Sequence, residues 1–165
     1  MDVLYHGLVG AVIAERTSAP SPLPAILSAL LPDVVGTVPF YAFKLLRALQ
    51  RPGPMNLRNL YADCMSNTFT NRIDKTAYRF THSFVTALLY SLILFTWFRD
   101  IWLPASLGYI SHILIDIPTH DGEFAARIFY PYFRVKIAGV NWTSNPALFL
   151  LFWGVLGAGY WLAIS

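Results

Sequence analysis

Apolar residues gather along this chain in runs separated by short polar turns, a pattern typical of helices in an apolar environment. Residues 3–14 predict a first apolar helix and residues 23–31 a second, and a turn rich in proline and serine separates them. We expect the second helix to end at Pro32-Asp33. Both are shorter than the roughly 20 residues that cross a bilayer. We therefore expect a helical hairpin that inserts halfway or packs inside a bundle.

A second hairpin is predicted after the polar interval 44–79. Its arms are the apolar runs 80–98 and 101–117, which turn at the charged pair between them. Residues 146–164 are uncharged and long enough to cross a bilayer, so they predict a C-terminal transmembrane helix. The pattern as a whole predicts an all-α integral membrane bundle. It consists of two helical hairpins plus a C-terminal transmembrane helix, in a single domain over residues 1–165.

Composition and charge agree with a membrane protein. Hydrophobic residues make up 56% of the chain and charged residues 13%, whereas a soluble domain carries about 25% charged residues. Lysine and arginine concentrate in the interval 44–79, with a smaller group at 127–136, so the positive-inside rule predicts that both are cytoplasmic loops. The net charge of +3 is modest. We therefore expect the lipid bilayer as the main partner, and a nucleic-acid partner is not expected.

A histidine and an aspartate stand inside the apolar run 101–117. His112 and Asp116 are four residues apart, so they lie on one helix face. Burying an imidazole and a carboxylate among leucines and isoleucines is costly unless they pair or bind a metal. In the predicted topology, the hairpin turns bring further ligand-type residues to the same layer near the cytoplasmic face. If the hairpins pack together, the converging candidate metal ligands are His6, Asp33, His82, His112 and Asp116.

Three imidazole nitrogens and two carboxylate oxygens suit zinc, with manganese and iron as the other candidates. A metal with an open position would lower the pKa of a bound water and supply hydroxide at neutral pH. Asp33 or Asp116 would orient that water. Two metals that share one of these carboxylates as a bridge are a natural extension for phosphoester chemistry. Three residues before His82, Arg79 is a candidate for binding phosphate.

Each of these residues also has a simpler interpretation. The His112–Asp116 pair alone is a weak signal, and hydrogen-bonded pairs of this kind are common. Arg79 is equally well explained as an ordinary cytoplasmic arginine. His120 and Asp121 follow a proline that interrupts the helix, so we interpret them as outer-shell residues or as part of a solvated turn.

The order of these motifs resembles a known family. His6-Gly7, Leu31-Pro32-Asp33, Thr81-His82-Ser83 and the stretch from Gly108-Tyr109 to Asp116 are similar to the YdjM-like inner-membrane metal-dependent hydrolases. The resemblance implies a prokaryotic-type inner membrane and a relation to the all-helical superfamily of zinc-dependent phospholipases C and single-strand nucleases. It also implies that the five converging residues are metal ligands. The family usually has a histidine where this chain has Tyr78.

The leading expectation is therefore a membrane-bound metal-dependent hydrolase that acts on a phosphoester of a lipid or lipid-linked molecule, with its site facing the cytoplasm. One alternative is a non-enzymatic membrane protein whose His/Asp cluster is structural, and it predicts a closed cluster. A proton-coupled carrier ranks lowest, because it needs a polar path to the far side. Beyond the cluster, the later spans offer only Thr86, Tyr90, Ser91 and Thr96.

Overall fold

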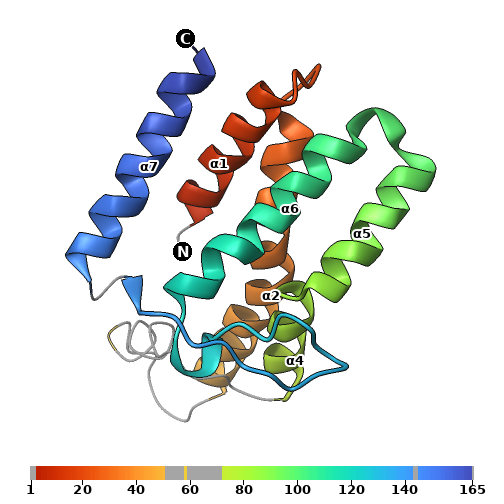
Figure 1. Ribbon diagram of the computed structural model, residues 1–165. Helices are drawn as coiled ribbons and strands as arrows, with labels where there is room; N and C mark the ends of the chain where they lie inside the picture. Colours follow the sequence, from red (N-terminus) through yellow and green to blue (C-terminus); the bar gives the residue numbers. More distant parts are fainter. Residues whose placement is uncertain (1–2, 51–57, 59–71, 143–144, 165) are drawn as a thin grey trace.

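The computed structural model describes residues 3–50, 58, 72–142 and 145–164, and this part of the chain is built from helices (Figure 1). The all-α expectation is confirmed, since no strand occurs among the described residues. The elements are α1 (Val3–Arg16), α2 (Leu23–Leu49), α4 (Arg72–Thr81), α5 (Phe84–Trp97), α6 (Arg99–Thr119), the short 3-10 helix η1 (Gly122–Phe124) and α7 (Pro146–Ile164).

The second helix is much longer than expected. α2 is a single helix of 27 residues that continues through Pro32 and Pro39, so the prediction of a helix over 23–31 that ends at Pro32-Asp33 was wrong. Apolar residues continue on both sides of Pro32, and its ring is fully buried. Packing against neighbouring helices stabilises such a helix although each proline removes one backbone hydrogen bond. Asp33 consequently lies in the middle of a helix and not at its end.

The interval 44–79, expected as a basic loop, is helical at both ends. Its first residues complete α2, and its last residues belong to α4. Apart from Arg58, the residues between 51 and 71 lie outside the described part of the chain. The prediction of a loop therefore holds neither for the end of α2 nor for α4.

The run 80–98, expected as one arm of a hairpin, is broken at His82-Ser83. α4 and α5 meet there at an angle of 59°. Ser83 is extended and caps α5, because its hydroxyl oxygen accepts a hydrogen bond from Val85 N at 3.1 Å. The same hydroxyl donates to Tyr130 O at 2.7 Å. The break therefore holds His82 between two helices.

Length and composition identify the candidate membrane spans among the described residues. α2 and α6 are long and apolar enough to cross a membrane, and the bent pair α4–α5 adds a third span if it is counted as one. The segment 146–164, expected as the clearest span, forms the uncharged helix α7 over those 19 residues, and its crossing of the membrane stays a prediction.

Small residues bring α1, α2 and α6 close together, and this packing positions the site. Ala25 and Ala29 of α2 are fully buried. A Cβ added at Gly108 of α6 would lie 2.4 Å from Ala25 O, and one added at Gly10 of α1 would lie 2.8 Å from the same atom. The helix backbones are therefore in near contact. In Figure 1, α7 stands beside α1, and α5 lies on the other side of α6.

Candidate metal centre

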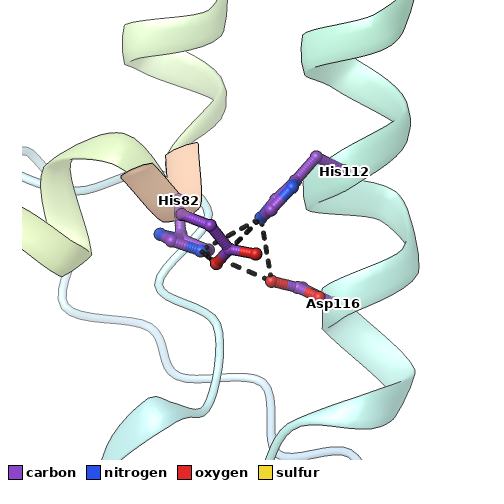
Figure 2. A group of neighbouring side chains, drawn as sticks. His82, His112 and Asp116 are labelled. Carbon is purple, nitrogen blue, oxygen red and sulfur yellow. Dashed lines mark hydrogen bonds and ion pairs between the residues drawn. The ribbon is translucent and has the colours of Figure 1, made fainter. Parts of the chain in front are cut away.

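Four side chains from different parts of the chain meet between α2, α6 and the α4–α5 break. Asp33, His82, His112 and Asp116 each offer one ligand atom, and these atoms all lie within 4.8 Å of one another. Figure 2 shows His82 reaching from the break toward His112 and Asp116, which lie one turn apart on α6. His82, His112 and Asp116 are buried, and only Asp33 is partly exposed. The structure thus forms a compact set of nitrogen and oxygen atoms in the interior.

The outer nitrogens of two histidines are fixed by backbone carbonyl groups. His112 Nδ1 lies 2.7 Å from Ala29 O, and His82 Nδ1 lies 2.9 Å from Tyr78 O. Because a carbonyl only accepts hydrogen bonds, each Nδ1 carries the proton and donates it. In a neutral ring of this tautomer, Nε2 has a free lone pair. This is the arrangement in which metal-binding histidines are held.

The two Nε2 atoms face each other. His112 Nε2 and His82 Nε2 are 3.1 Å apart, a spacing that requires either a proton or a metal ion between the two nitrogens. Carboxylate oxygens surround them: Asp116 Oδ2 lies 3.2 Å from His112 Nε2 and 3.4 Å from His82 Nε2, and Asp33 Oδ1 lies 3.5 Å from His82 Nε2. Ligands at about 2.0–2.1 Å from a tetrahedral zinc are separated by about 3.3 Å. The donor types and spacings therefore fit a divalent metal.

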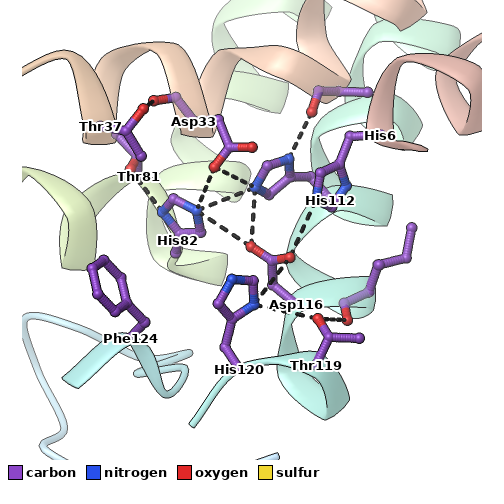
Figure 3. A network of polar contacts seen from close by, with 12 residues as sticks. His6, Asp33, Thr37, Thr81, His82, His112, Asp116, Thr119, His120 and Phe124 are labelled. Atoms are coloured by element: carbon purple, nitrogen blue, oxygen red, sulfur yellow. Dashed lines mark hydrogen bonds and ion pairs between the residues drawn. The ribbon is translucent and has the colours of Figure 1, made fainter. Parts of the chain in front are cut away.

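His6 and His120 contact the same centre through the other oxygen of Asp116 (Figure 3). His6 Nε2 lies 3.2 Å from Asp116 Oδ1, and His120 Nδ1 lies 3.3 Å from that atom. The His6 ring also stacks on His112, with centroids 3.8 Å apart. Burial lowers the pKa of His120 to about 4, so its ring is neutral at pH 7. All five predicted ligands are thus brought together, and His120 joins them.

Comparison with protein families shows to which family the chain belongs. The family model described as YdjM inner membrane protein matches residues 1–164. The chain belongs to the YdjM inner membrane protein family. No curated protein and no solved structure matches it. The family description and the apolar helices α2 and α6 together identify a protein of the inner membrane, embedded in the lipid bilayer.

His120 occupies a more central place in this YdjM-family chain than its sequence context suggested. The interruption expected at Pro118 does not occur, because α6 continues through this proline to Thr119. His120 follows as the C-cap, with its backbone N–H donating to Asp116 O. The spacing of four residues from Asp116 was the signal that could have placed it.

Tyr78, noted above as a departure from the expected pattern, supports the centre through its ring and its backbone carbonyl. Its ring stacks on His82 with centroids 3.9 Å apart, and its carbonyl oxygen accepts the hydrogen bond from His82 Nδ1. Its hydroxyl donates to Phe124 O at 3.2 Å, which ties α4 to η1. The sequence indicated only a missing ligand at this position. In the structure, Tyr78 orients a neighbouring ligand.

Two of the predicted site residues lie apart from this cluster. Among the described residues, no hydrogen bond or ion pair joins Arg79 to it, and the charged neighbours of Arg79 are Arg127 and Glu123. Asp121 is exposed. The centre therefore consists of four histidines and two aspartates, and Arg79 faces the segment that follows α6.

Proposed function

We propose that this YdjM-family protein is a membrane-bound metal-dependent hydrolase that acts on a phosphoester of a lipid or lipid-linked molecule. One observation carries the proposal. The Nε2 atoms of two buried histidines lie 3.1 Å apart, and carboxylate oxygens of Asp33 and Asp116 lie 3.2 to 3.7 Å from them. Buried groups packed this closely need a cation between them, and a metal ion would bind all four ligand atoms at once.

Asp33, His82, His112 and Asp116 would hold the metal, with zinc as the first candidate and manganese or iron as the others. A divalent metal in this centre would lower the pKa of a bound water and so supply hydroxide at neutral pH. His82 and His112 keep their Nε2 atoms aimed inward through their bonds to Tyr78 O and Ala29 O. Asp33 or Asp116 orients the attacking water.

The place of the centre in the fold supports a substrate at the membrane surface. His120 and Asp116 lie at the end of α6, and the segment that follows carries Arg127, Arg134 and Lys136. These basic residues favour the cytoplasmic side. We therefore propose that the site faces the cytoplasm, where lipid phosphate groups lie at the same depth.

Arg79 is the candidate for holding the phosphate. It stands on α4, three residues before His82, and has a second guanidinium, that of Arg127, among its charged neighbours. Two arginines held near each other attract an anion. If Arg79 binds the phosphate, Arg79→Gln raises KM severalfold with a smaller effect on kcat, whereas Arg47→Gln on α2 leaves both unchanged.

The test is hydrolysis by the full chain in detergent, loaded with zinc or manganese. Short-chain phosphatidic acid, a phosphatidylglycerol and a polyprenyl phosphate serve as substrates, and released phosphate or alcohol is measured. We expect turnover of at least one of them that is lost on chelation and in Asp116→Asn, and kept in the exposed control Asp121→Asn. The proposal is wrong if no substrate is turned over faster than by Asp116→Asn.

A structural role for the cluster is the second candidate, and one observation favours it. The four-residue group offers a full tetrahedral set of protein ligands, and its histidines and Asp116 have side chains no more than 3% exposed. Closed sites of this kind usually stabilise a fold. In that case, metal binding would raise the unfolding temperature in detergent while every phosphoester stayed intact.

A further inference from the structure

The two carboxylate oxygens of Asp116 face different histidines. Oδ2 lies 3.2 Å from His112 Nε2 and 3.4 Å from His82 Nε2, whereas Oδ1 lies 3.2 Å from His6 Nε2 and 3.3 Å from His120 Nδ1. Figure 3 shows His82 and His112 on one side of this carboxylate, with His120 on the other. The Asp116 carboxylate thus contacts two separate pairs of histidine nitrogens.

His6 is a buried histidine near this carboxylate, and its ring lacks a hydrogen bond. Its side chain is 0% exposed, and neither ring nitrogen makes a hydrogen bond within the described residues. Nε2 nevertheless lies 3.2 Å from Asp116 Oδ1. Burying an imidazole nitrogen without a partner is unfavourable. A cation between Nε2 and Oδ1 removes this penalty for Nε2, because both atoms then become ligands.

His120 approaches the same oxygen from the end of α6. Its Nδ1 lies 3.3 Å from Asp116 Oδ1 and 3.3 Å from Thr119 Oγ1. The Thr119 hydroxyl donates its proton to Ile115 O at 2.8 Å, so both neighbouring oxygens act as acceptors toward Nδ1. A proton on Nδ1 would be donated to these oxygens, whereas a metal on Nδ1 would bind Asp116 Oδ1 as well. The separations of 3.2 and 3.3 Å also match the spacing of about 3.3 Å between ligands of a tetrahedral metal.

We propose that His6 Nε2, His120 Nδ1 and Asp116 Oδ1 form a second metal position, and that Asp116 bridges it to the first. This inference rests on the proposed function, since it assigns the water-activating position of the same centre. The first position has four protein ligands and is closed, whereas the second has three and keeps one position open. Catalytic zinc sites are typically of the second kind.

Exposure places the open position on the accessible side. The side chain of His120 is 23% exposed, compared with 13% for Asp33 and 3% for Asp116 and His82. Substrate therefore reaches the second position first, from the side of the segment that follows α6. The closed first position holds Asp116 and His112 in place, so the structural and the hydrolytic interpretations each describe one half of a two-metal centre.

The experiment is metal content per chain, measured by mass spectrometry on the full-length protein in detergent after loading with zinc and removal of free metal. We expect about two metals per chain in the natural protein, as in other two-metal sites, and about one in His120→Ala. Asp121→Ala is the matched control and keeps about two, because Asp121 is exposed next to His120.

A measurement on the natural protein alone guards against a variant that fails to fold. Two Mn²⁺ ions bridged by a carboxylate give an exchange-coupled electron paramagnetic resonance spectrum, whereas isolated ions give a six-line spectrum. A purely six-line spectrum at saturating Mn²⁺ overturns the second position. Equal binding of about one metal by the natural protein and by His120→Ala overturns it too, while the proposed function stands. Absence of metal from the natural protein overturns both.

Discussion

The two sides of α1 are packed in opposite ways. On one side, α1 and α6 both lie close to α2, since Gly10 and Gly108 leave no room for a Cβ against Ala25 O. Toward α7 the contacts are made by large side chains, and an apolar groove of about 490 Å³ remains, lined by residues such as Tyr5, Ile115 and Leu156. His6, Asp33 and His112 lie on α1, α2 and α6, the helices of the closely packed side.

This difference indicates which helices must be positioned most accurately. A metal site requires its ligand atoms to be placed within a few tenths of an ångström, and helix backbones in near contact have little freedom to shift. His6, Asp33 and His112 are all carried by helices of the close interface. α7 carries none of the ligands, so its packing can remain loose.

Loss of the shared carboxylate should have the largest effect. Asp116→Ala removes a contact to all four histidines, which lie 3.2 to 3.4 Å from its oxygens. We expect zinc affinity to fall by more than the roughly 100-fold seen when an outer-shell partner is lost, measured by competition with a chelating dye. Affinity within a factor of three of the natural value would show that the cluster is not a metal site.

A glycine pair compares the two interfaces directly. Gly108→Ala places a Cβ 2.4 Å from Ala25 O and forces α2 and α6 apart, whereas a Cβ at Gly154 of α7 meets nothing within 4 Å. We expect Gly108→Ala to lower the free energy of unfolding by about 2–3 kcal/mol. Gly154→Ala should leave it unchanged or raise it by up to about 1 kcal/mol. Denaturant unfolding in detergent, followed by circular dichroism, measures both, and equal effects would contradict the contrast between the interfaces.

Removing the Tyr78 ring, which stacks on His82, should have a smaller effect on zinc affinity. Tyr78→Ala removes the ring that lies 3.9 Å from the imidazole and frees His82 to rotate. We expect zinc affinity to fall about tenfold, as for other orienting contacts. Tyr78→Phe keeps the ring and loses the bond to Phe124 O, so it should bind zinc normally. Equal loss in both variants would assign the effect to the hydroxyl and not to the ring.

The smallest effect is expected on the loose side. Tyr5→Phe removes the hydroxyl that donates to Phe152 O of α7 at 3.1 Å. The expected loss is about 1 kcal/mol of unfolding free energy with no change in metal content. Tyr160→Phe on α7 is the control, because Tyr160 is 53% exposed. A change of metal content in Tyr5→Phe would show that α7 contributes to the centre after all.

The sequence predicted the helical class and the residues that meet at the centre, because four-residue spacing and apolar surroundings follow from local rules. It could not predict that α2 continues through Pro32, since that depends on neighbouring helices that stabilise the proline. For the same reason it missed the approach of His120 to Asp116 across Pro118. The orienting role of Tyr78 is a tertiary contact with no sequence signature.

The most direct test of the metal centre is zinc retention by the full chain, compared with the double variant His112→Ala/Asp116→Ala. Both proteins are loaded with zinc in detergent, passed through gel filtration in metal-free buffer, and analysed by mass spectrometry. We predict that the natural protein keeps stoichiometric zinc and that the double variant, eluting at the same volume, keeps none. Zinc-free natural protein, also after loading with manganese, would contradict the account and leave the histidines as a structural cluster.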